Sequence, residues 1–111
     1  MITIKMDYRP DGRISSFTLS GHANFAKHGQ DIVCAGVSAV SFGAVNSIFA
    51  LTDVQPKIDQ GGDGGYLHCE IPEDLPKDSQ ERVQLILESM LVSLQTIERD
   101  YGKYMKITLS K

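Results

Sequence analysis

Two residues of this sequence, Cys34 and His22, have the types and the spacing that nucleophilic catalysis needs. If Asp31 caps the long apolar helix that follows it, Cys34 lies in the first turn, where unpaired N–H groups and the helix dipole stabilise a thiolate. His22 stands at the exit of a predicted strand and leads into the loop before Asp31, so its imidazole can face the same helix end. Such a pair activates the thiol and later protonates the leaving amine. The alternative is that Cys34 is a small packing residue.

Residues near this pair could support it, and each also has a purely structural explanation. Ser38 follows Cys34 by one turn on the same helical face, where it could hydrogen-bond within the site or permit close packing. The Asp31 carboxylate could orient His22 instead of capping the helix, although its charge would oppose thiolate formation. The glycine-bounded loop of residues 21–30 is either a lid over a substrate peptide or an exposed connection.

The second cysteine, Cys69, occupies a different setting. It alternates with Tyr66, His68 and Glu70 in a predicted strand, which points its thiol into the core, where burial makes it inert. The potential metal ligands lack zinc-site spacing; they are His22, His28, Cys34, His68 and Cys69. We therefore expect no metal.

The glycine-rich run of residues 61–65 is not a phosphate loop, because no Lys-Ser/Thr follows it. A hairpin turn explains it better, and we expect no organic cofactor.

The elements that must position these residues follow from hydrophobic periodicity. Alternation predicts strands, and steps of three and four predict helices; the strands are residues 2–8, 16–20, 56–60, 66–71 and 105–109, and the helices are residues 32–51 and 79–101. The order ββαββαβ predicts an α/β (α+β) fold of two layers, an antiparallel or mixed sheet with two helices on one face. The chain has 111 residues and no long linker, which predicts a single domain, residues 1–111.

Charge and composition exclude several classes of protein. Eleven basic residues against 14 acidic ones give a net charge of −3, which supplies no basic field for nucleic acid. Two cysteines and no evident signal peptide predict a cytoplasmic protein with free thiols. The uncharged segment of residues 32–51 is long enough to span a bilayer. It is interrupted by polar residues and glycines and has no flanking Lys/Arg clusters, which favours a helix buried in the protein over a membrane-spanning helix. Because that helix is apolar on more than one side, we expect a homodimer.

At this stretch the sequence resembles the ribosomal-processing cysteine proteases, the Prp family. The resemblance is carried by Gly21-His22-Ala23 and by Gly29-Gln30-Asp31-Ile32-Val33-Cys34-Ala35-Gly36-Val37-Ser38-Ala39, and it extends over nearly the whole chain. It implies a cytoplasmic, homodimeric endopeptidase that removes the N-terminal extension of ribosomal large-subunit protein 27, a step in ribosome maturation. It also implies that Cys34 is the nucleophile and His22 its base, with Gly21, Asp31 and Ser38 as supporting residues. The alternative function is a non-catalytic, ribosome-associated module that binds protein, with Cys34 as packing.

Overall fold

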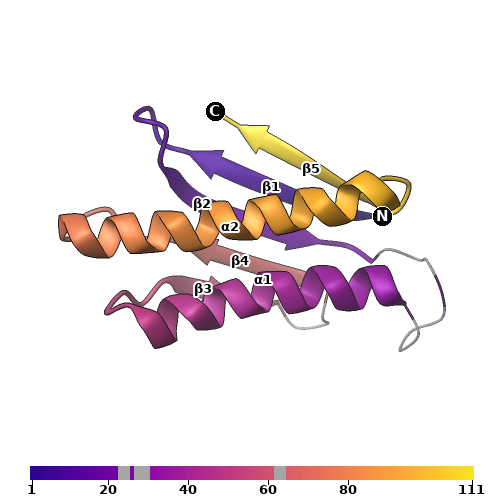
Figure 1. Ribbon diagram of the computed structural model, residues 1–111, viewed down its shortest axis with the longest axis horizontal. Coiled ribbons are helices and arrows are strands. Elements are labelled where there is room, and N and C mark those ends of the chain that lie inside the picture. Colours follow the sequence, from indigo (N-terminus) through magenta and orange to yellow (C-terminus); the bar gives the residue numbers. More distant parts are fainter. Residues whose placement is uncertain (23–25, 27–30, 62–64) are drawn as a thin grey trace.

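The computed structural model describes residues 1–22, 26, 31–61 and 65–111. Its elements run in the predicted order ββαββαβ, and they are β1 (Ile2–Tyr8), β2 (Ile14–Ser20), α1 (Ile32–Leu51), β3 (Lys57–Asp59), β4 (Tyr66–Glu70), α2 (Lys77–Tyr101) and β5 (Met105–Ser110) (Figure 1). Most of the suggested lid, His28 included, and the centre of the glycine-rich turn lie outside the described residues.

The sheet is mixed, one of the two arrangements, antiparallel or mixed, that the order of elements predicts. Its strands lie in the order β3-β4-β2-β1-β5, and β1 pairs antiparallel with β2 and parallel with β5. Strand β4 pairs antiparallel with both β2 and β3. Figure 1 shows α1 and α2 side by side on one face of this sheet. The two-layer α+β architecture is thereby confirmed.

The core lies between the helices and that face of the sheet. Alternation in β1 buries Ile4 and Met6, which stand opposite Leu19 and Phe17 of β2. The predicted stripe of α2 contributes its buried positions to the same core; these are Val83, Leu87, Met90 and Leu94. The inward side chains of the strands, at every second residue, and the apolar stripe of the helix, at every third or fourth residue, therefore pack together in one apolar layer.

Helix α1 buries one side only. Its buried residues recur at helical spacing; they are Val33, Val37, Ser41, Ala44, Val45 and Ile48. By length and composition α1 could cross a membrane, and 33% of its most apolar window is buried. The same composition occurs in core helices of soluble proteins, and α1 packs here against α2. Its opposite side remains exposed, with Phe49 and Leu51 among the exposed apolar residues.

Several element boundaries differ from the sequence-based prediction. Helix α2 begins at Lys77, two residues before Ser79, because the carbonyl of the N-cap Pro76 already accepts a helical hydrogen bond, from Gln80 N–H at 2.9 Å. Strand β2 begins at Ile14 rather than residue 16, since a bulge lets Ile14 pair with Tyr8. Strand β3 is shorter than predicted, and β4 ends one residue earlier.

Gly102 ends α2 as predicted, but its φ of −60° is right-handed. A Cβ there would lie 3.0 Å from the Glu98 carbonyl oxygen. Gly102 therefore packs closely on the preceding turn without adopting a left-handed backbone.

Leu94 and Gln95 are neighbours on α2 that test this account of the core. Leu94 is fully buried and Gln95 is exposed. Leu94→Ala should lower the free energy of unfolding by about 2–5 kcal/mol, because it removes buried methyl groups and leaves a cavity. Gln95→Ala should change it by less than about 0.5 kcal/mol. Urea unfolding followed by circular dichroism measures both, and equal losses would contradict the burial described above.

Candidate active site

Cys34 lies in the first turn of α1, where the sequence predicted it. Asp31 is the N-cap, with an extended backbone, and its carboxylate oxygen Oδ1 accepts a hydrogen bond from the Cys34 N–H at 2.9 Å. The Asp31 carbonyl accepts the first helical bond, from Ala35 N–H at 3.0 Å. This is the geometry of a side-chain N-cap. The predicted cap is confirmed, and it sets the position of the sulfur.

The surroundings of Cys34 suit a reactive thiol. Its side chain is half-buried at the edge of the core, so a reagent or substrate can approach from one side. No acidic side chain lies within the first turn of α1 itself, and the unpaired N–H groups of a helix start favour a negative charge. The cap carboxylate is the one opposing charge that these contacts place beside Cys34.

Cys69 is the contrasting case. It is the fourth of the five residues of β4, stands opposite Phe17 of β2, and is completely buried. Burial raises the pKa of the Cys69 thiol to about 12, so the thiol stays protonated and inaccessible. The predicted burial of Cys69 is confirmed, in contrast to the half-buried Cys34.

His22 follows the end of β2 and is exposed. The residue before it, Gly21, has a φ of +89°, and a Cβ at Gly21 would overlap the carbonyl oxygen of Met1. Its N–H donates to the Gly65 carbonyl at 2.8 Å, which extends the β2–β4 ladder by one pair. The His22 ring lies directly over Gly65: a Cβ there would stand 2.8 Å from Nε2. The absence of a side chain at Gly65 thus leaves the space that the imidazole occupies, and Gly21 allows the chain to pass close to Met1.

The fold carries both predicted catalytic residues to one end of the molecule. The end of β2, the start of β4 and the start of α1 lie at the same end of the long axis (Figure 1). Within the described part of the chain, no hydrogen bond joins the Cys34 sulfur to the His22 ring. Catalytic hydrogen bonds often form only once substrate is bound. A direct hydrogen bond between Cys34 and His22 stays a prediction.

The remaining candidates separate by location. Ser38 is half-buried on α1, one turn beyond Cys34. His68 lies in β4 on the sheet face opposite the core, where its Nδ1 is 2.8 Å from Thr18 Oγ1 and its Nε2 is 3.9 Å from Glu70. Among residues 1–22, 26, 31–61 and 65–111, no group of three His, Cys, Asp or Glu side chains could hold a metal ion.

Comparison with known proteins agrees with a thiol-based site. A family model described as "Cysteine protease Prp" matches residues 1–106. The chain belongs to this family of cysteine proteases. It is 53% identical over 98 residues to the ribosomal processing cysteine protease Prp of Bacillus subtilis, covering 88% of each chain. It is 40% identical to the Staphylococcus aureus protein of the same name, over 96% of this chain and 97% of that one.

The fold is also shared with a solved structure of this family. The ribosomal processing protease Prp from S. aureus, in complex with a covalently linked product peptide, superposes with a TM-score of 0.91. The match has 40% sequence identity and covers 99% of this chain and 100% of that chain. The chain is thus a cysteine protease, a hydrolase, with the α+β fold of its relatives.

The two thiols should differ in reactivity toward iodoacetamide. Cys34 is accessible at the helix start, whereas Cys69 is buried and its raised pKa keeps it protonated. At about pH 8 the folded protein should therefore be labelled at Cys34 well before Cys69, since the thiolate is the reacting species. Peptide mass mapping over time measures both rates. Equal rates in the folded protein, as in a urea-unfolded control, would refute the two environments.

Proposed function

We propose that this chain is the endopeptidase that removes the N-terminal extension of ribosomal large-subunit protein 27. Residues 1–111 form one protease domain, with Cys34 as nucleophile and His22 as general base and acid. The observation that carries the proposal is the placement of Cys34 in the capped first turn of α1, at the end of the molecule where β2 delivers His22. Membership in a family of cysteine proteases gives that placement its chemical meaning.

In the first half of the reaction, His22 takes the proton from the Cys34 thiol. The sulfur then attacks the scissile carbonyl carbon, and the carbonyl oxygen becomes an oxyanion. The N–H of Cys34 is already bound by Asp31, so the remaining main-chain donors of the first turn, Ile32 and Val33, are the ones we assign to the oxyanion. Collapse of this intermediate breaks the C–N bond, and His22 protonates the leaving amine.

In the second half, water completes the cleavage. The N-terminal part of the substrate is held on Cys34 as a thioester, and His22 takes a proton from a water molecule that attacks it. The thiolate leaves, the cut extension departs as a carboxylic acid, and the proton returns from His22 to sulfur. This mechanism uses neither a metal nor an organic cofactor.

Three supporting residues act on position rather than on the reacting bonds. Asp31 fixes the residue at which α1 starts and thereby places the Cys34 sulfur in the first turn. Gly21 turns the chain after β2 with a positive φ, so that the next residue leaves the ladder toward the site. Ser38 lies one turn along α1 from Cys34, where a hydroxyl can hydrogen-bond within the site.

The substrate and the compartment are inferred from the relatives and from the motif. The similar proteins of B. subtilis and S. aureus are named for ribosomal processing, and the S. aureus structure holds a covalently linked product peptide. The sequence motif around His22 and Cys34 resembles that of the proteases that process ribosomal protein 27. Both cysteines are free, which suits the reducing cytoplasm where ribosomal proteins are made.

Cleavage of a peptide that spans the extended N-terminus of the cognate ribosomal protein 27 tests this function. The unmodified chain should cut it once, and Cys34→Ala should abolish cutting because no nucleophile remains. His22→Ala should slow it by about 10²–10⁴-fold, the usual contribution of an acid–base group. Mass spectrometry of the products identifies the cut.

Cys69→Ala is the matched control, because it removes a thiol that burial has made inert. It should retain the cutting activity of the unmodified chain. An intact peptide bound equally well by the unmodified chain and by Cys34→Ala would instead establish the non-catalytic binding module.

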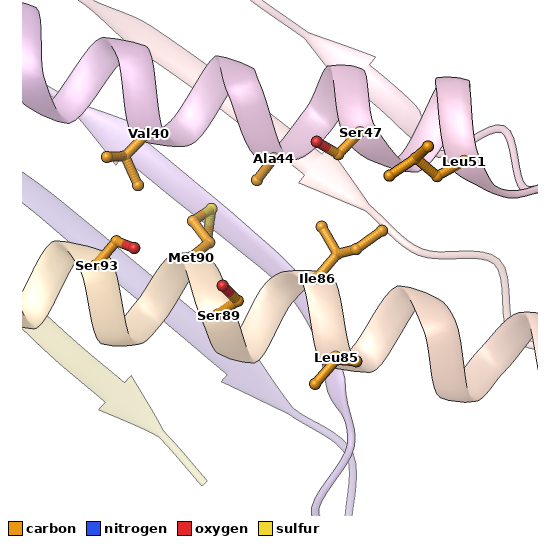
Figure 2. A pocket seen from close by; sticks show the side chains of 9 residues that line it. All are labelled: Val40, Ala44, Ser47, Leu51, Leu85, Ile86, Ser89, Met90 and Ser93. Carbon is orange, nitrogen blue, oxygen red and sulfur yellow. The ribbon is translucent and has the colours of Figure 1, made fainter.

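We further propose that two copies pair through their helices. A groove of about 370 Å³ runs between α1 and α2 on the side away from the sheet, and Figure 2 shows its lining, which is mostly apolar and includes three serines. Leu51 and Leu85 line it and are each 70% exposed. An uncharged helix beside such a groove is an unusually apolar surface, and a second copy covers it with the same surface.

Light scattering coupled to size exclusion tests this pairing. The unmodified chain should have twice the mass of one chain, and Leu85→Glu should have the mass of one, because a carboxylate would be desolvated at the interface. Leu109→Glu is the control: Leu109 is 41% exposed on β5, outside the groove. A single-chain mass for the unmodified protein at all concentrations would disprove the homodimer.

A further inference from the structure

We infer that Gly65 is a positioning residue for His22: the missing side chain at position 65 leaves the space in which the imidazole lies when it serves Cys34. The inference rests on the proposed function, in which His22 is the acid–base group. Sequence reasoning assigned Gly65 only to a hairpin turn, since nothing in the linear sequence relates it to His22.

The two residues are brought together by the β2–β4 ladder. Ser20 stands opposite Tyr66, and the ladder continues with the 2.8 Å hydrogen bond from Gly21 N–H to the Gly65 carbonyl. This bond holds the backbone of Gly65 against the residue that precedes His22. The separation of the two strands at this point is therefore set by regular pairing.

At that separation a side chain on Gly65 and the ring of His22 would occupy the same space. A Cβ at Gly65 would stand 2.8 Å from His22 Nε2 and 2.9 Å from Cε1, closer than such atoms approach in proteins. The strands are held by the ladder, whereas His22 is an exposed side chain that turns about its own bonds. The ring would therefore move and the backbone would stay. The predicted consequence is a displaced base in a folded protein.

Gly61 supplies a matched control. It has the same φ of +67° as Gly65, so a side chain strains the backbone equally at both positions. Among the described residues, the atoms nearest to a Cβ at Gly61 belong to the Tyr66 side chain, at 3.4 Å, which is close to ordinary contact. A difference between Gly65→Ala and Gly61→Ala therefore reports the contacts specific to position 65, of which those with the His22 ring are the closest and the Gly21 carbonyl oxygen, at 3.4 Å, is the next.

The test compares both variants with the unmodified chain in cleavage of the ribosomal protein 27 peptide. Gly65→Ala should lower kcat about tenfold or more, part of what an acid–base group contributes, with KM changed less than about threefold. It should also change the limb of the pH–rate profile that reports His22. Gly61→Ala should keep kcat within about threefold and leave the profile unchanged.

A double variant shows whether Gly65 acts through His22. In the His22→Ala background, Gly65→Ala should cause no further loss in the rate at which iodoacetamide labels Cys34. An additional loss there, or an equal kcat loss in Gly61→Ala, would mean that Gly65 has a merely structural role and would overturn the inference. Full kcat in Gly65→Ala would overturn it as well, while cleavage that depends on Cys34 would leave the proposed function standing.

The position of the His22 imidazole can also be followed by NMR, without measuring cleavage. The ¹H–¹³C resonance of His22 Cε1 in the folded protein should shift in Gly65→Ala and stay in place in Gly61→Ala. If the unmodified chain does not cleave the peptide, the proposed function fails, and this measurement alone decides the contact: an unshifted resonance in Gly65→Ala overturns it.

Discussion

The hydrogen bond between the Cys34 N–H and the Asp31 carboxylate is the contact on which the site depends. It fixes the residue at which α1 begins and thereby places the sulfur in the first turn. A cap of this kind contributes about 0.5–2 kcal/mol to helix stability. The same carboxylate opposes a thiolate, and the helix dipole favours one by only about 0.3–1 kcal/mol. These two electrostatic effects oppose each other at the Cys34 sulfur.

The sheet supplies the second half of the geometry. Antiparallel pairing sets the exit of β2 beside the entry of β4, so Gly21 and Gly65 become neighbours although 44 positions separate them. Both glycines have positive φ values and both meet atoms where a side chain would stand. The imidazole of His22 therefore lies against bare backbone, held by a ladder that belongs to the core of the fold.

The two sides of α1 have different surroundings: one packs on the sheet and the other is exposed beside α2. The side of α1 that faces the sheet buries Val33, Val37 and Ile48 and thereby orients the first turn. Its other side, together with α2, leaves a wide apolar surface that includes Leu51 and Leu85 (Figure 2). An uncharged helix can form both the buried side and the exposed apolar side because neither side requires a charged side chain. The same lack of charge explains why its composition resembles a membrane span.

Local rules were sufficient wherever a residue's setting depends on its own segment. Alternation in β4 placed Cys69 inward, and the cap residue before an apolar run placed Cys34 at a helix start, because both signals act within a few residues. They were insufficient at Ser79, where the preceding proline starts α2 earlier, and at Gly102, whose backbone is right-handed. At Ser79 the boundary of α2 moved by two residues, whereas at Gly102 the boundary was as predicted and only the backbone conformation differed.

The sequence by itself determined the order of elements, the buried face of β1, β2 and β4, and the different burial of the two cysteines. Tertiary structure alone decided which strands are neighbours, that β5 runs parallel to β1, and that Gly65 lies under the His22 ring. The physical reason is range. Periodicity and capping act between residues a few positions apart, whereas a contact across 40 positions exists only after two strands have paired and the core beneath them has closed.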